Sequence, residues 1–135
     1  MLDDLGSDKH SYPLEFLLEA LTVKGISLLC IKKQEEAIEC FDWALKMDVD
    51  PPVANTAEIF FFKGSALSQI ERYDESIECF DKVIEIEPQR WHTWEMKGIV
   101  YGMKGNLEEE EKCRSKSNEM KKVWFEKNPE KPSDR

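Results

Sequence analysis

The sequence predicts an all-α fold, built from about six antiparallel helices that stack as successive pairs. The first observation is a repeated pentapeptide: Ile-Glu-Cys-Phe-Asp occurs at residues 38–42 and again 39 residues later, at residues 77–81. The second is a set of three glycines, Gly25, Gly64 and Gly98, which recur at intervals of 39 and 34 residues. The third is the spacing of the apolar residues, which follows the period of a helix. Together these observations indicate three copies of one helix pair.

The first helix pair is expected over residues 14–31 and 34–47. Apolar residues recur at helical spacing from Leu14 to Ile31, and Pro13 suits the first turn of a helix, where a backbone N–H has no helical partner. The prolines at positions 51 and 52 end this unit, because proline cannot continue a helix.

The second helix pair is expected over residues 56–70 and 73–86. Asn55, with Glu58 three residues later, resembles a capping box that opens the first of these helices. Gly64 lies in the middle of that helix, where glycine costs about 1 kcal/mol relative to alanine. We therefore expect another helix to cross so close to Gly64 that no Cβ atom fits. Pro88 then stops the second helix.

The third pair is expected over residues 91–104 and from Leu107 to about residue 127, with a turn at Gly105-Asn106. Its last helix carries only a thin apolar stripe, formed by Leu107, Cys113, Met120 and Trp124. The end of a stacked array needs a polar outer face, so this helix is predicted to be a cap. Residues 1–12 are expected to form a flexible lead-in and residues 128–135 a mobile tail.

The charge distribution argues against a nucleic-acid surface. The chain has 135 residues and a formal net charge of −9, and the acidic side chains are concentrated before residue 112. Phosphate binding requires clustered Lys and Arg, which appear only as a short basic end. There is no run of about 18 apolar residues for a membrane span and no apolar signal core at the N-terminus. We therefore expect a cytoplasmic protein.

The cysteine spacing indicates neither a zinc site nor a disulfide framework. No CxxC or Cys/His pair is present, and Cys40, Cys79 and Cys113 occupy equivalent places in the three repeats. Equivalent sites on neighbouring repeats lie about 8–10 Å apart or more, whereas a disulfide needs Cα atoms within about 7 Å. We expect these three residues to be small buried apolar side chains.

Residues 60–88 resemble one complete tetratricopeptide repeat. The matching residues, at the family's spacings, are Phe60, Gly64, Leu67, Tyr73, Ser76, Phe80, Val83 and Pro88. The resemblance implies a right-handed superhelix, a single domain over residues 13–127, and repeats at approximately 18–51, 57–90 and 91–124. It also implies that Ala37, Phe41 and Ala44 face inward in the first repeat.

The sequence does not favour catalysis. The chain has only two histidines, His10 and His92, and no known motif places a nucleophile beside either of them. A Gly-rich phosphate loop, GxSxG and HExxH are all absent, and the many carboxylates lie at salt-bridge spacing on helices. We expect no enzymatic activity, no cofactor and no metal site.

In the tetratricopeptide family, the first helices of successive repeats line a concave groove that binds peptides or helices. The resemblance places such a groove on this chain, and matching positions give its lining residues. These are Glu19, Thr22, Ile26, Leu29 and Cys30 from the first repeat, Glu58, Phe61, Phe62, Ser65, Ser68 and Gln69 from the second, and His92, Glu95, Met96, Ile99 and Met103 from the third. The family's Lys/Asn/Arg clamp for a C-terminal carboxylate is absent, because its positions hold Thr22, Ile26, Phe62, His92 and Met96.

Two functions of different kinds remain open. The apolar floor and acidic edges expected of the groove suit an amphipathic helix with a basic flank, which favours a non-catalytic adaptor that binds a protein or peptide. Alternatively, the chain is a self-associating structural unit, a homodimer in which the groove or the last helix is buried. A regulatory piece joined to an enzyme is a third possibility, because one fold hosts many functions.

Overall fold

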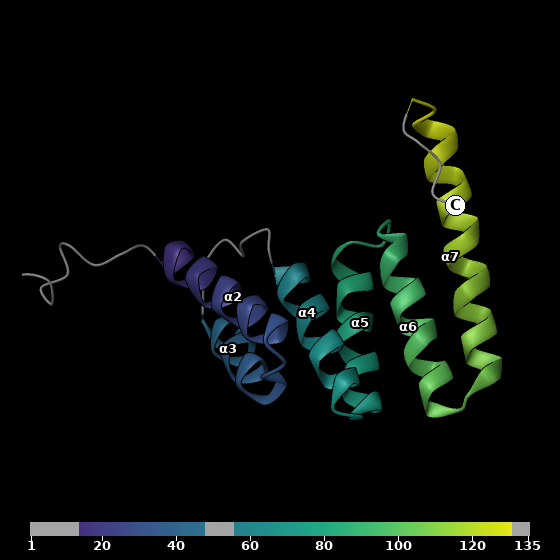
Figure 1. Ribbon diagram of the computed structural model, residues 1–135. Coiled ribbons are helices and arrows are strands. Elements are labelled where there is room, and N and C mark those ends of the chain that lie inside the picture. Colours follow the sequence, from purple (N-terminus) through teal and green to yellow (C-terminus); the bar gives the residue numbers. More distant parts are fainter. Residues whose placement is uncertain (1–13, 48–55, 131–135) are drawn as a thin grey trace, which may run out of the picture.

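The computed structural model describes residues 14–47 and 56–130, and within these ranges it is all α-helical. The helices follow one another as three antiparallel pairs that stack in a row from one end of the molecule to the other (Figure 1). Their bounds are α2 Leu14–Cys30, α3 Gln34–Lys46, α4 Thr56–Gln69, α5 Tyr73–Ile86, α6 Trp91–Lys104 and α7 Leu107–Lys127. The predicted fold class is confirmed. Residues 13, 51, 52 and 55, the lead-in 1–12 and residues 131–135 lie outside the described ranges, so the expectations for them stay predictions.

The first helices of the first two repeats end one residue earlier than expected because a left-handed residue follows each of them. Lys32 and Glu71 have φ angles of 64° and 65°, respectively. The next N–H groups then turn back onto the helix, Lys33 donating to the Leu28 carbonyl at 2.8 Å and Arg72 donating to the Leu67 carbonyl at 2.9 Å. In the third repeat, the equivalent residue is Gly105, with φ 90°. Glycine adopts this conformation without the steric penalty of a side chain.

The helices of each pair cross where the glycines lie, as the sequence predicts. A Cβ atom on Gly64 would lie 3.0 Å from the Phe80 ring, and one on Gly25 would lie 2.5 Å from the Phe41 ring. Ser76 strengthens the contact in the second repeat, because its buried hydroxyl donates to the Gly64 carbonyl at 2.6 Å. Ala37, Phe41 and Ala44 are buried, as expected for inward-facing residues.

Successive repeats are joined by the same apolar contact and the same ion pair. Ile38 of α3 packs against Leu67 of the next repeat. Beside this contact, Asp42 pairs with Lys63 at 2.6 Å, and one repeat later Asp81 pairs with Lys97 at 2.6 Å. Burial disfavours the charged form of Lys97, but the hydrogen bond and charge of Asp81 outweigh it and raise the pKa of Lys97. The duplicated pair sets the register of the stack.

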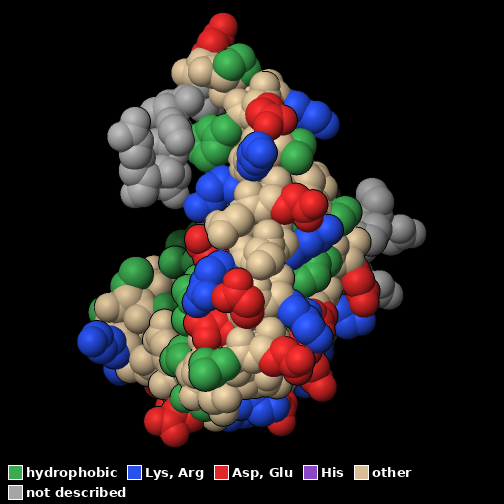
Figure 2. Space-filling view, turned by 90° about the vertical axis from the view of Figure 1, so that its right-hand side faces the viewer, with side chains coloured by type: hydrophobic (Ala, Val, Ile, Leu, Met, Phe, Trp, Pro, Cys, Tyr) green, Lys and Arg blue, Asp and Glu red, His purple; other side chains and the backbone are tan. Residues whose placement is uncertain are grey.

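The last helix, α7, packs against α6 and extends beyond the other helices (Figure 1). Its expected apolar stripe is only partly correct. Cys113 is buried and Met120 is half-buried, but Leu107 and Trp124 are exposed, and the second fully buried residue is Ser117. Acidic and basic side chains alternate over the outer face (Figure 2). Such a face does not extend the apolar stack, which fits a capping helix.

The four cysteines are free thiols, and Cys40, Cys79 and Cys113 are buried as expected, whereas Cys30 is exposed. Burial raises the pKa of the Cys79 thiol to about 11. The thiolate is the reactive form. We therefore expect the exposed Cys30 thiol to react rapidly with dithionitrobenzoate in the native protein, and the three buried thiols to react only on unfolding. A fast-reacting thiol that survives in a Cys30→Ser variant would contradict this assignment.

Two buried hydroxyls, those of Thr93 and Ser117, have no hydrogen-bond partner within the described part of the chain. A desolvated hydroxyl without a partner destabilises the folded state. Replacement Thr93→Val keeps the shape and removes the hydroxyl, so we expect the free energy of unfolding to rise by about 1 kcal/mol in urea denaturation. The matched control is Thr22→Val, which removes a hydroxyl that donates to the Leu18 carbonyl at 2.8 Å and should therefore destabilise the protein. If Thr93→Val and Thr22→Val change the free energy of unfolding equally, the missing hydrogen bond of Thr93 does not destabilise the protein.

No helix in the described ranges has both the length and the apolar character needed to cross a membrane.

Candidate functional site on the first helices of the repeats

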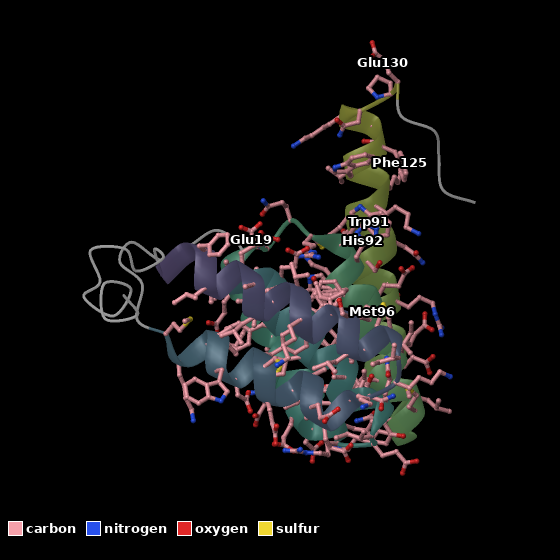
Figure 3. The ribbon with its side chains drawn as sticks, turned by 60° about the vertical axis from the view of Figure 1, so that its left-hand side comes forward. Glu19, Trp91, His92, Met96, Phe125 and Glu130 are labelled. Carbon is pink, nitrogen blue, oxygen red and sulfur yellow. The ribbon has the colours of Figure 1, made fainter. Side chains whose placement is uncertain are left out.

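The residues expected to line a groove lie on α2, α4 and α6, the first helices of the three repeats. α4 contacts both α2 and α6, so the three helices form one continuous surface. Figure 3 shows three of these residues, Glu19 on α2 and His92 and Met96 on α6. The expected residues nevertheless differ in how much side chain they offer to a ligand.

Phe61 and Phe62 form the centre of this surface, and both are half-buried. Their rings meet edge to face at a centroid distance of 5.8 Å. The Phe61 ring also meets the Phe80 ring at 5.5 Å, and the Phe62 ring stacks on Phe41 at 6.5 Å. The guanidinium of Arg90 lies 4.6 Å from the centre of the Phe61 ring. Both phenylalanines therefore belong partly to the core, and Arg90 covers part of the Phe61 ring.

The most accessible apolar side chains of the expected groove are Ile99 and Met103 on α6, each 49% exposed. Ile26 and Leu29 on α2 are half-buried and pack against the core of the first repeat. The open apolar part of the surface is therefore on the third repeat.

Several expected groove residues are buried or engaged by other residues. Thr22 is only 4% exposed, so its expected place in an open groove is wrong. It occupies the position equivalent to Phe61, which packs inward on Phe80, and its hydroxyl is satisfied within its own helix. Gln69 is exposed but accepts a hydrogen bond from Gln34 of α3 at 2.9 Å, which places it at the junction of two repeats.

The polar residues of the surface are mostly acidic and exposed. Glu19 and Glu58 are exposed, and Glu95 is exposed beside Lys121, 3.7 Å away. His92 stacks on Trp91 with the ring centroids 3.6 Å apart, which holds the imidazole at the start of α6. The remaining small polar side chains contribute little, because Ser68 is buried and donates to the Ser65 carbonyl at 2.8 Å. The described residues contain no His, Cys, Asp and Glu cluster able to hold a metal ion.

The third repeat contains a hollow between its two helices. In the second repeat, Phe61 and Phe80 fill the space between the two helices. The equivalent positions of the third repeat hold Glu95 and Arg114, and a hollow of about 220 Å³ opens there. Its lining residues are Glu95, Gly98, Ile99, Glu110, Arg114, Ser117 and Asn118.

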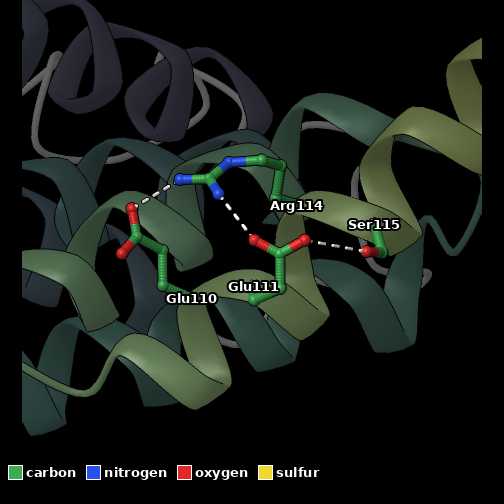
Figure 4. Close-up of polar contacts among 4 residues, drawn as sticks. All are labelled: Glu110, Glu111, Arg114 and Ser115. Carbon is green, nitrogen blue, oxygen red and sulfur yellow. Dashed lines mark hydrogen bonds and ion pairs between the residues drawn. The ribbon is translucent and has the colours of Figure 1, made fainter.

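Arg114 lines this hollow and binds two carboxylates of its own helix. It donates to Glu110 at 2.8 Å and to Glu111 at 2.7 Å (Figure 4). The unpartnered hydroxyl of Ser117 lies in the hollow wall. Sequence matching did not predict the α7 side of this site. The sequence nevertheless contained a signal, because Glu110, Arg114 and Ser117 stand where the family has small, aromatic and small residues.

A second hollow, of about 440 Å³, lies on the extended part of α7 and was not anticipated from the sequence. Its lining residues are Gln89, Lys116, Glu119, Met120, Val123, Trp124 and Lys127. It combines half-exposed apolar side chains with lysines, the opposite charge to the acidic surface of the first helices.

Comparison with known proteins identifies the repeat. A model of the tetratricopeptide repeat family matches residues 57–90, and no curated protein matches the sequence. A crystal structure of MamA superposes with a TM-score of 0.70 at 19% identity, over 92% of this chain and 66% of that one. A further MamA structure has 55% of its length covered, so the chain spans roughly half to two thirds of these proteins.

Two further solved structures are complexes. PcrH with the chaperone-binding region of PopB has a TM-score of 0.72 at 15% identity, over 81% of this chain and 84% of that one. The second tetratricopeptide domain of Spaghetti (RPAP3), bound to the HSP90 peptide SRMEEVD, has a TM-score of 0.66 at 17% identity. The superposition covers 76% of this chain and 91% of that one. Residues 57–90 therefore form a tetratricopeptide repeat, and the solved structures share the helical fold of the chain around it.

Proposed function

We propose that this chain is a non-catalytic interaction module that binds a peptide or amphipathic helix of a partner protein on the surface of α2, α4 and α6. The observation that carries the proposal is the exposed pair Ile99 and Met103 beside the hollow of the third repeat. The peptide-bound structures with a similar fold support binding on this architecture.

The chemistry of the surface defines the ligand. Apolar side chains of the ligand would cover Ile99, Met103 and the open faces of the two phenylalanines, because exposed apolar area of this kind is typical of interaction sites. A lysine or arginine of the ligand would approach Glu95 and Glu110 at the hollow and compete there with Lys121 and Arg114. A free C-terminal carboxylate is not favoured, since the residues of the family's clamp are absent.

The experiment is a selection of helical peptides from a displayed library against the native chain, followed by measurement of their affinities. We expect the selected peptides to combine apolar residues at helical spacing with Lys or Arg. Their affinity should fall by about 30-fold or more in the Ile99→Asp, Met103→Asp variant, because charged groups replace central apolar contacts. Both residues are half-exposed, so the variant should still fold.

The matched control is an Ile86→Asp, Leu107→Asp variant, which changes two apolar residues that are also exposed but do not lie on this surface. It should bind the selected peptides like the native chain. Peptides that bind both variants equally well would rule out the surface of the first helices as the site.

Self-association is a second candidate function, favoured by the extended part of α7. Its apolar residues Met120, Val123 and Trp124 lie in the second hollow, among lysines that complement the acidic body of another copy. Sedimentation of the native chain should then give twice the mass of one chain, and Val123→Glu should restore the monomer while Leu107→Glu should not. A native monomer at high concentration would exclude this function.

A further inference from the structure

The contact between successive repeats occurs twice in the molecule, and its two copies define what one face of a repeat binds. In each copy, a helix of the preceding repeat presents an isoleucine and, four residues later, an aspartate. Ile38 and Asp42 meet the second repeat, where Asp42 pairs with Lys63; Ile77 and Asp81 occupy the same places before the third repeat, where Asp81 pairs with Lys97. The face that receives the helix is therefore an apolar patch with one lysine.

The first repeat has the same face, and none of the described helices packs on it in the way that α3 packs on the second repeat. Lys24 stands 39 residues before Lys63, is exposed, and forms no ion pair within the described part of the chain. Leu28 and Ile31 stand at the positions equivalent to Leu67 and Ile70. Leu67 is buried beneath α3, whereas Leu28 is only half-buried and Ile31 is 61% exposed. Among the described residues, the first repeat thus leaves Lys24 unpaired and Leu28 less buried than their equivalents in the second repeat.

A hollow of about 380 Å³ marks this face, and the equivalent positions of the second repeat line a smaller hollow of about 170 Å³. It is lined by Leu21, Lys24, Leu28, Glu36, Glu39, Cys40 and Trp43. The largest difference from the other repeats is Trp43, which is 67% exposed at a position where the second repeat has Lys82. Exposed tryptophan is uncommon on a free surface and frequent among the residues that dominate binding energy at interfaces. Trp43 therefore adds an aromatic contact beside the lysine.

We infer that this face of the first repeat, comprising Leu21, Lys24, Leu28, Ile31 and Trp43, is a docking site for an amphipathic helix of another protein that carries one carboxylate for Lys24 and keeps other acidic side chains away from Glu36 and Glu39. The helix presents an aliphatic residue on Leu28 and Ile31, and a carboxylate four residues later on Lys24. Both requirements come from the molecule itself, where α3 and α5 satisfy them on the second and third repeats. This site is distinct from the surface of the first helices and does not depend on the function proposed above.

Stacking of a second copy through its last helix does not satisfy these requirements. The positions of α7 equivalent to Ile38 and Asp42 hold Glu111 and Ser115, which give no aliphatic residue and no free carboxylate. Glu111 already pairs with Arg114 at 2.7 Å (Figure 4). The charge and apolar complementarity therefore favour a separate helix over the end of another copy.

The probe is a synthetic peptide with the sequence of residues 73–86, with Cys79 replaced by serine, capped at both ends and locked as a helix by a side-chain staple on its solvent face. Its helicity is first verified by circular dichroism. It is titrated into the isotope-labelled full chain and followed by NMR, which detects even millimolar binding. We expect shifts confined to α2 and α3 around Lys24, Leu28 and the Trp43 indole.

A charge exchange tests the geometry. Lys24→Asp should weaken binding of the probe by about tenfold, and a probe carrying Asp81→Lys should bind this variant within about threefold of the original affinity. The control Lys122→Glu, which removes an exposed lysine of α7 in the last repeat, should leave binding unchanged.

Several outcomes overturn the inference. These are a verified helical probe that produces no shifts, shifts located on Ile99 and Met103 instead, or equal binding by Lys24→Asp. Two others assign the face to a different occupant. If deletion of residues 1–12 shifts the Lys24 and Trp43 signals without the probe, the chain's own N-terminal segment covers it. If dilution shifts them, a second copy does.

Discussion

Replacement of Phe80 by alanine is expected to lower the free energy of unfolding by about 3–5 kcal/mol. The ring is completely buried over Gly64 and packs edge to face on Phe61. It also shares a cluster with Ile77 and with Val100 of the next repeat, so its loss leaves a cavity that touches two repeats. Because small domains are stable by about 5–15 kcal/mol, this one change should remove a large part of the total.

Urea denaturation followed by circular dichroism measures the effect. The control is Ile86→Ala on the same helix, which truncates a half-exposed side chain and should cost about 1 kcal/mol or less. If the free energies of unfolding of the two variants differ by less than 1 kcal/mol, Phe80 is not the centre of the core. A partly folded Phe80→Ala variant with an ordered first repeat would instead show that the repeats unfold separately.

Alanine at Gly25 should also destabilise the protein strongly, by about 2–3 kcal/mol. A Cβ atom there would lie 2.5 Å from the Phe41 ring, which is fully buried and cannot move aside. This clash outweighs the gain of about 1 kcal/mol that alanine brings to a helix interior. The glycine is therefore required by the close approach of α3 and not by its backbone conformation.

Gly102→Ala is the matched control, because a Cβ atom there would meet the Glu110 carboxylate at 2.9 Å. That carboxylate ends a flexible side chain and can shift, so the higher helix propensity of alanine should leave stability unchanged or raise it by up to about 1 kcal/mol. Thermal unfolding of both variants at one protein concentration compares them directly. Similar losses of stability in the two variants would mean that helix packing does not explain why glycine recurs at this position of the three repeats.

Most of the fold could be predicted from the sequence because its signals are local and repeated three times. Helix bounds agreed to within one residue, and the glycine crossings were anticipated from the cost of glycine inside a helix. The differences at Lys32 and Glu71 arose because neither residue is typical of a left-handed turn, so the sequence contained no glycine to mark the helix end.

The candidate site was harder to predict, because exposure depends on neighbours that lie far apart in the chain. Position matching put Thr22 and Ile99 on the same surface, yet one is buried and the other is open. The hollow of the third repeat exists because that repeat has Arg114 at the position where the second repeat has the ring of Phe80. Sequence matching records such a departure but does not show what space it leaves.

The sequence by itself determined the repeat, the pairing of its helices and the lack of a carboxylate clamp, because each depends on residue types at fixed spacing. Only the tertiary structure decided which surfaces remain uncovered. Lys24, Lys63 and Lys97 are the same residue in three repeats, but the second and third are paired and the first is free within the described chain. The physical reason is that a helix face is buried by the element stacked on it, and the first repeat has no described element before it.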